Sequence, residues 1–281
     1  MSDIANSYCT LAEFKRYIKP SGQTLSIDAD DDDVIESMIE TASRRVDNLC
    51  GRKFYPTVAA ELYDIPYDNV IWFGDDLLAV LSFLNGDAVA ILAAEYILKH
   101  ANSYPKYCLQ LRDTSSTIFV TNSSTSSQQV LTVNGIWGFH IDYARAWKLA
   151  GTLAAAWAST TTLTATMTAG HVLDAHGGQI LKIDNELYNS SSVVANTLTV
   201  QARGDNGSTA ATHLILAPVY VWKPMSEINQ LTMEVANIMY HSRHGENVET
   251  TSTYTSAGVI VTPRSLPMWA QEVIRKYQRI V

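Results

Sequence analysis

Three observations predict an α+β protein. Both ends of the chain carry apolar residues at helical spacing. The residues between them, 58–222, alternate short apolar runs with turn residues. The hydrophobic content of 47% is sufficient for a proper core. We therefore expect a helical region formed by both chain ends, 1–57 and 223–281, with one or two antiparallel β-rich units, 58–145 and 146–222, inserted between them.

The first end predicts a helical hairpin. Thr10 is a good helix N-cap, and Glu13 lies three residues on, where a capping box needs it. The acidic run 30–33 favours the positive end of a second helix. Gly51 ends that helix. Steps of three and four place its apolar residues on one face: Val34, Ile35, Met38, Ile39, Ala42, Val46 and Leu49.

The middle of the chain predicts two strand-rich units. In the first, turn signals at 85–87, 122–124 and 134–135 separate the apolar runs 70–73, 77–84 and 118–120, which indicates antiparallel hairpins. A short link is expected over 142–149. In the second, the threonine-rich segment 160–167 and the segments 179–188 and 197–200 favour strands. Gly204 and Gly207 suit a tight loop with positive φ, and Arg203 is expected to pair with Glu186.

The second end predicts two more helices. Pro224 opens one, through Ile228, Leu231, Val235, Ile238 and Met239. After a polar loop, Leu266 and Pro267 begin a last helix that ends in the basic segment 276–279.

These two ends resemble the head-tail connector family of tailed bacteriophages, the adaptors that lie beneath the portal. The resemblance covers roughly residues 8–56 and 224–281, with looser support from 131–139. It rests on the order of many positions: Thr10, Glu13, Lys15, the aspartates 30–33, Ala42, Ser43, Val46, Asp47, Cys50, Gly51, Arg52 and Phe54, then the Leu266-Pro267 start of a short basic helix. The second β-rich unit is similar to a β module repeated across phage virion proteins.

The resemblance implies a non-enzymatic structural virion protein without a cofactor. Its implied place is the neck of a virion assembled in the host cytoplasm, as a ring, a dodecamer in the family, that joins the capsid vertex to the tail. The implied partners are the portal ring, neighbouring copies of the chain, and a downstream tail or head-completion protein. The genomic DNA would pass through without sequence-specific binding, consistent with the net charge of -8. The absence of a heptad seam suggests a chain that is monomeric until the portal templates the ring.

The last helix is the main candidate for portal docking. It combines an apolar stripe with a basic surface on an acidic protein, which suits attachment to a partner. The candidate residues are Trp269, Val273, Ile274, Arg275, Lys276, Tyr277 and Arg279. Packing of this stripe on the chain's own domain is the competing interpretation.

The loop 245–263 is a second candidate contact, toward a neighbouring subunit or the tail. Val259, Ile260 and Val261 favour a strand that could add to the edge of a neighbour's sheet, and Tyr254 lies in the polar segment before it. A surface loop with one internal strand is equally compatible.

The sequence gives little support for disulfides, metal sites or a membrane span. Three widely spaced cysteines suggest neither a disulfide framework nor a zinc site. The 28–39 segment departs from a calcium loop at its sixth and twelfth positions, and His171, His176 and His213 with Asp174 lack a tight ligand pair, so no metal is expected. There is no apolar stretch long enough for a membrane span, and the first residues do not resemble a signal peptide.

Two alternative functions remain open. One is a tail-associated carbohydrate- or receptor-binding β protein, suggested by Trp137, Trp147 and Trp157 among serine- and threonine-rich loops. The other is a hydrolase whose acidic residues and histidines meet only in the folded chain.

Overall fold

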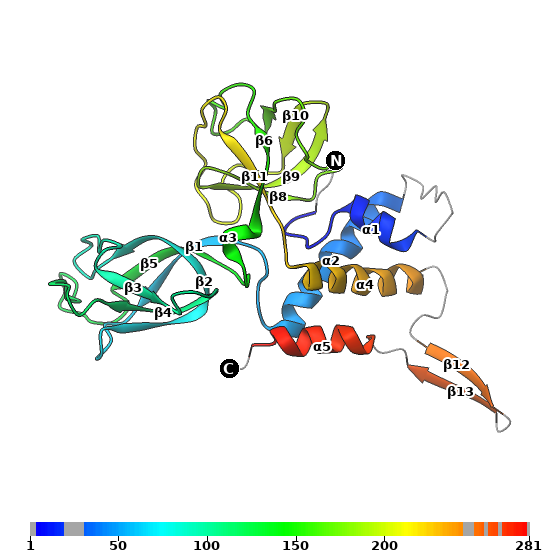
Figure 1. Ribbon diagram of the computed structural model, residues 1–281, viewed down its shortest axis with the longest axis horizontal. Coiled ribbons are helices and arrows are strands. Elements are labelled where there is room, and N and C mark those ends of the chain that lie inside the picture. Colours follow the sequence, from blue (N-terminus) through cyan, green and yellow to red (C-terminus); the bar gives the residue numbers. More distant parts are fainter. Residues whose placement is uncertain (1–3, 20–30, 244–249, 256–257, 264–265, 280–281) are drawn as a thin grey trace.

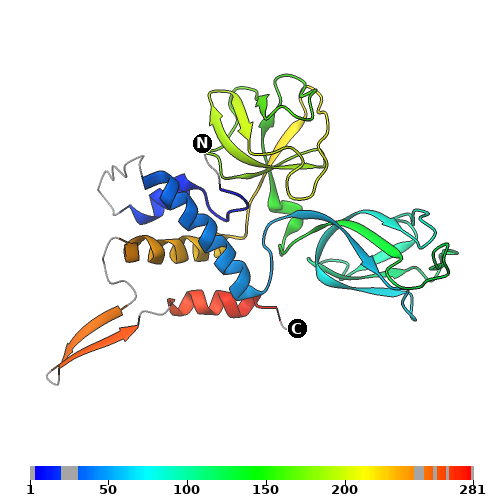
Figure 2. The same ribbon diagram turned by 180° about the vertical axis from the view of Figure 1, so that it is seen from behind.

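The computed structural model describes residues 4–19, 31–243, 250–255, 258–263 and 266–279, and the side chains of these residues except 250–263. It is a mixed α+β protein with two large antiparallel sheets. Figures 1 and 2 show two β units and one hairpin that extend from a group of helices in different directions.

Four helices form what we call the helical unit: α1 (Leu11–Ile18), α2 (Asp32–Cys50), α4 (Ser226–Arg243) and α5 (Met268–Tyr277). Helix α2 contacts the other three. One apolar core joins all four, with Phe14 from α1, Ile39 from α2, Leu231 from α4 and Ala270 from α5 fully buried. Residues distant in the sequence therefore share this core.

The ends of α1 and α2 follow the predicted signals. The Thr10 side chain accepts a hydrogen bond from the Glu13 amide, and the Glu13 carboxylate accepts one from the Thr10 amide, so the capping box is confirmed. Gly51 adopts the left-handed conformation, φ 62°, that ends α2 as predicted.

The first β unit is a sheet of five antiparallel strands in the order β1-β5-β2-β4-β3. Its core includes Phe83, Leu109, Val133 and Trp137. The strands are β1 (Thr57–Tyr63), β2 (Val70–Leu84), β3 (Tyr96–Lys99), β4 (Lys106–Leu111) and β5 (Leu131–Trp137).

Two predictions for this unit are wrong. Asn134 and Gly135 form no turn but lie inside β5, where a Cβ on Gly135 would stand 2.8 Å from the Ala79 carbonyl oxygen of β2. Glycine there permits close approach of the strands. The run 118–120 is not a strand; Phe119 instead packs against Phe83 from a loop. The turn at 85–87 is confirmed, with the Ala88 amide bonded to the Asn85 carbonyl.

The second β unit is a sheet of six antiparallel strands in the order β6-β11-β8-β9-β10-β7. The short helix α3 (Tyr143–Ala146) leads into it. The expected link over 142–149 therefore contains both α3 and the start of β6. The strands are β6 (Trp147–Thr152), β7 (Thr164–Thr166), β8 (Ile180–Ile183), β9 (Glu186–Val194), β10 (Thr197–Val200) and β11 (Pro218–Trp222).

The two β units share a small apolar cluster. Leu78 and Ile136 of the first unit meet Ile180 and Trp222 of the second, together with Ala146 of α3. Tyr55, just before β1, packs both against this cluster and against the core of the helical unit.

Between α4 and α5 the chain forms a hairpin of β12 (Thr250–Thr255) and β13 (Gly258–Pro263). It projects away from the helices in both views (Figures 1 and 2). One internal strand was expected in this region; the β-branched segment 250–255 adds a second.

Candidate interaction surface

The apolar stripe of α5 is largely used inside the chain. Tyr277 is 4% exposed, and its ring contacts Phe54 and Phe139 edge to face. Trp269, Val273 and Ile274 are partly buried and pack against the core of the helical unit. The helical spacing that suggested a docking face therefore serves the chain's own core, as the competing interpretation had it, and docking on a portal stays a prediction.

Two of the basic residues of the candidate site already have acidic partners. The Lys276 amine lies 2.8 Å from Glu227 of α4, and the Arg279 guanidinium lies 2.8 Å from Asp75 of β2. The hydrogen bond from Lys276 lowers the pKa of Glu227. Burial and a hydrogen bond to Glu227 raise the pKa of Tyr277. The C-terminal turn of α5 is therefore fastened to α4.

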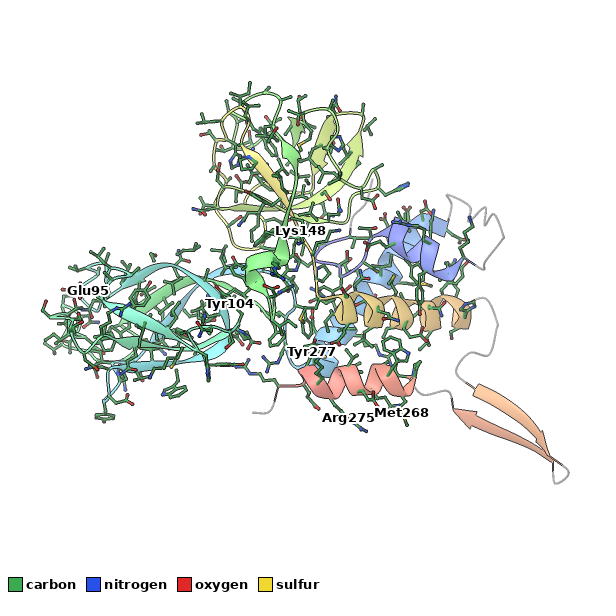
Figure 3. All side chains as sticks on the ribbon, viewed as in Figure 1. Glu95, Tyr104, Lys148, Met268, Arg275 and Tyr277 are labelled. Carbon is green, nitrogen blue, oxygen red and sulfur yellow. The ribbon has the colours of Figure 1, made fainter. Side chains whose placement is uncertain are left out.

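A smaller surface of α5 faces outward. Met268 is 78% exposed. Arg275 is also exposed, on the side of the helix opposite buried Tyr277 (Figure 3). No ion pair of Arg275 occurs among the described residues. Met268, which the sequence analysis did not include in the predicted site, and Arg275, which it did, form what we call the outer face of α5.

The four residues of the second candidate contact lie in the hairpin. Tyr254 is opposite Val259, and Ile260 and Val261 are opposite Thr253 and Ser252. Their side chains lie outside the described part of the structure. The prediction that this segment contacts a neighbour stays a prediction.

The second β unit contains a buried ionic network that the sequence predicted in part. The Arg203 guanidinium lies 3.0 Å from Glu186, and both side chains are almost fully buried. Arg203 also donates to the Ala211 carbonyl and stacks 4.0 Å from the centre of the Trp157 ring. Burial raises the pKa of Glu186, but hydrogen bonds from Arg203 and the Ala211 amide outweigh it and lower this pKa to about 2.

His213 completes this network. The sequence did not indicate that His213 would contact Glu186. Its Nδ1 lies 2.8 Å from Asp184 and its Nε2 lies 3.0 Å from Glu186 and 2.5 Å from the Tyr188 hydroxyl. His171 instead bonds the Ala195 carbonyl. Among the described residues, no three His, Cys, Asp or Glu side chains are arranged so that they could hold a metal ion. The network is built to hold the loop around Arg203 to strand β9.

The tryptophans that suggested carbohydrate binding are buried. Trp137 is 3% exposed with its indole N-H on the Ala59 carbonyl, and Trp157 is 4% exposed within the ionic network. Trp147 is partly buried against Trp222. Sugar stacking needs an open ring face, so these residues do not support the carbohydrate-binding alternative.

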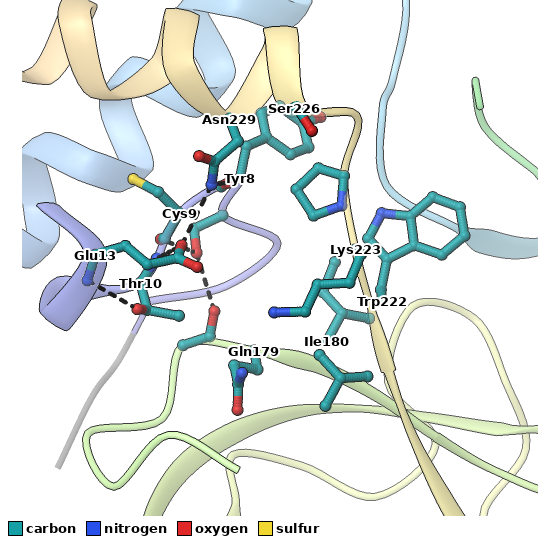
Figure 4. A pocket seen from close by; sticks show the side chains of 14 residues that line it. Tyr8, Cys9, Thr10, Glu13, Gln179, Ile180, Trp222, Lys223, Ser226 and Asn229 are labelled. Carbon is teal, nitrogen blue, oxygen red and sulfur yellow. Dashed lines mark hydrogen bonds between the residues drawn. The ribbon is translucent and has the colours of Figure 1, made fainter. Parts of the chain in front are cut away.

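A cavity of about 330 Å³ lies where the helical unit meets the second β unit (Figure 4). Figure 4 shows Lys223 extending into it, opposite Thr10 and Glu13. Asn229 of α4 donates to the Tyr8 carbonyl and to Glu13. Cys9 is buried there, and burial raises its pKa, which leaves a poor nucleophile.

Comparisons with known proteins add no assignment. A scan of the chain against models of protein families gave no match, and a search among characterised proteins gave none. Within the described residues, none of the helices combines the length and apolar character needed to cross a membrane.

Proposed function

We propose that this chain is a head-tail connector, a non-enzymatic virion protein that forms a ring between a phage portal and the tail. The observation that carries this proposal is the shared core of α1, α2, α4 and α5, which brings together the two resembling ends of the chain. The β units and the hairpin extend outward from this core (Figure 1). That arrangement suits a subunit that contacts several neighbours.

The residues that carry the resemblance have structural roles in the helical unit. Thr10 and Glu13 cap α1, and Gly51 caps α2. Asp47 accepts a hydrogen bond from the Tyr8 hydroxyl, and Phe54 is buried in the core. These contacts maintain the helical scaffold of this chain, and the proposal carries the family's role to it on the order of these positions in the sequence.

In this proposal the outer face of α5 is the part that docks on the portal. The exposed methionine supplies adaptable apolar area, and Arg275 supplies a charge that can pair with an acidic partner. The hairpin and the β units are then available to neighbouring copies and to a downstream tail or head-completion protein. The formal charge of -8 per chain would keep a DNA channel from binding phosphates tightly.

The test of the ring is cryo-electron microscopy of the neck in virions of the phage that encodes the chain. We expect a closed ring between portal and tail, with α5 directed at the portal. Density for this chain only at the tail tip would overturn the proposal and favour a receptor-binding role.

The test of the docking face uses Met268→Glu combined with Arg275→Glu. Both side chains are exposed, so the variant should keep its folding while association with purified portal falls by more than about tenfold. Arg145→Glu, on an exposed side chain of α3, is the matched control and should bind as the unmodified chain does. Equal binding by all three proteins would exclude this face.

A further inference from the structure

The helical unit meets the β units through polar contacts and through one buried aromatic contact, in which Phe139, just after β5, packs against Phe54 and Tyr277. A cleft of about 450 Å³ separates the helical unit from the first β unit, and the cavity of about 330 Å³ separates it from the second. Interfaces of this kind inside one chain resemble transient protein-protein interfaces, for which relative motion is the ordinary expectation.

Ion pairs cross the larger cleft. Arg52, just after α2, places Nη1 2.6 Å and 2.7 Å from the two carboxylate oxygens of Asp76. Arg279, just after α5, pairs with the neighbouring Asp75. Both aspartates lie where the pairing register of β2 shifts between Trp72 and Leu77, an irregularity that re-aims side chains. We call these two ion pairs the latch.

The N-terminal segment before α1 connects the helical unit to the second β unit. The Asn6 amide donates to the Asn189 side chain of β9, and the Asn6 and Asn206 side chains bond each other. The Ser7 hydroxyl donates to the Gly178 carbonyl. These are neutral hydrogen bonds, in contrast to the charged latch.

A further small group of contacts lies at the two segments that connect the helical unit to the β units. The Trp222 indole N-H of β11 donates to the Phe54 carbonyl at 3.1 Å, and His140 Nε2 lies 3.2 Å from the Lys223 carbonyl. Only the segments 51–56 and 223–225 connect the helical unit to the β units covalently. This group is suited to act as a pivot.

We propose that the two β units, joined by their shared apolar cluster, move as one body that rocks on the helical unit, and that the latch holds the closed position. Opening the larger cleft requires the separation of Arg52 from Asp76 and of Arg279 from Asp75. The apolar cluster of Leu78, Ile136, Ile180 and Trp222 keeps the two β units together during the motion.

The experiment is distance measurement by pulsed electron paramagnetic resonance on the full chain. One label pair, Gln230→Cys with Ser124→Cys, joins exposed positions of α4 and the first β unit. A second pair, Ser124→Cys with Val194→Cys, joins the two β units. The three native cysteines are buried, so the labels attach at the introduced positions.

The latch is opened by Asp75→Asn with Asp76→Asn. We expect the first label pair to give a distance distribution about twofold broader, and the second pair to keep its distribution. Asp142→Asn, which removes an exposed ion pair with Arg145 inside the β part, is the control and should change neither. An unchanged first pair would overturn the latch, and a changed second pair would overturn the single rocking body.

Salt provides a test without substitution, should the double variant fail to fold. In about 1 M NaCl the Debye screening length is roughly 3 Å, and the Arg279–Asp75 pair should weaken first because it is more exposed than the Arg52–Asp76 pair. In the labelled chain without the latch substitutions, the distance distribution of the first label pair should then broaden, and that of the second pair should not. A distribution independent of salt would contradict an electrostatic latch.

Discussion

Arg203 and Glu186 form an ion pair in which the side chains are 4% and 0% exposed. The Gly204 and Ala211 amides and His213 also bond the Glu186 carboxylate, at 2.8, 2.7 and 3.0 Å. The carboxylate therefore ties strand β9 to the loop 203–213. A buried pair of this kind contributes most visibly when one partner is removed, because the other charge is then left buried without compensation.

We predict that Glu186→Gln lowers the free energy of unfolding by about 3 kcal/mol, because Arg203 loses its buried counter-charge. Urea denaturation followed by tryptophan fluorescence measures this, since Trp157 stacks on Arg203. Asp142→Asn, from an exposed ion pair, should change stability by less than about 0.5 kcal/mol. Similar effects of the two substitutions would contradict the assigned role of the buried pair.

The same carboxylate predicts a dependence on acid pH. The pKa of Glu186 is about 2 in the folded chain, below its ordinary value of 4.5. The unfolded chain therefore binds the proton first, and the stability from this group is present above pH 4.5 and lost as the pH falls toward 2. The stability difference between the unsubstituted chain and Glu186→Gln should shrink over that range in urea denaturation. A constant difference would show that the carboxylate is not the titrating group.

Asp47 predicts the opposite dependence. Burial raises its pKa to about 6 against the opposing charge of Arg44, so the folded chain holds the proton more tightly than the unfolded chain. The contribution of this group to stability is then present below pH 3.8 and falls as the pH rises through 6. Relative to the unsubstituted chain, Asp47→Asn should gain about 2 kcal/mol between pH 4 and pH 7. Thermal unfolding at several pH values measures this relative gain, and parallel curves would disprove it.

Gly207 predicts a steric effect where the second β unit meets β1. A Cβ at this position would lie 2.1 Å from the Val58 carbonyl oxygen, and φ is +77°. The neighbouring Asn206 carbonyl accepts a hydrogen bond from the Val58 amide. We expect Gly207→Ala to lower the free energy of unfolding by about 2 kcal/mol more than a matched substitution without a clash.

Gly170 supplies that match. Its φ is +82°, yet no atom lies within 4 Å of the Cβ that alanine would add. Gly170→Ala therefore carries the conformational cost alone, about 1 kcal/mol. Equal losses for the two variants, measured by urea denaturation, would mean that the contact with Val58 relaxes without cost.

Much of the helical unit and of the strand content could be predicted because the signals are local. The Thr10 and Glu13 cap, the Gly51 cap and the apolar spacing of α2 act within one or two helical turns, so their partners are near in the sequence. The Arg203 and Glu186 pair was also predicted, since both residues lie in neighbouring segments of the second β-rich unit. These features need no knowledge of distant residues.

Tertiary structure decided which surfaces are free. The spacing of Trp269, Val273, Ile274 and Tyr277 defines an apolar face but not its partner, and the core of the helical unit takes that face. Gly135 carries a turn signal, but the close approach of β2 makes it part of a strand.

The sequence by itself determined the α+β fold class, the main helices and most of the strands, because caps, turns and periodicity act between near neighbours. Only the tertiary structure decided that Arg52 meets Asp76, that Asn6 meets Asn189, and that Trp137 and Trp157 are buried. These outcomes depend on how separate elements pack, and packing energies join residues that no local pattern relates.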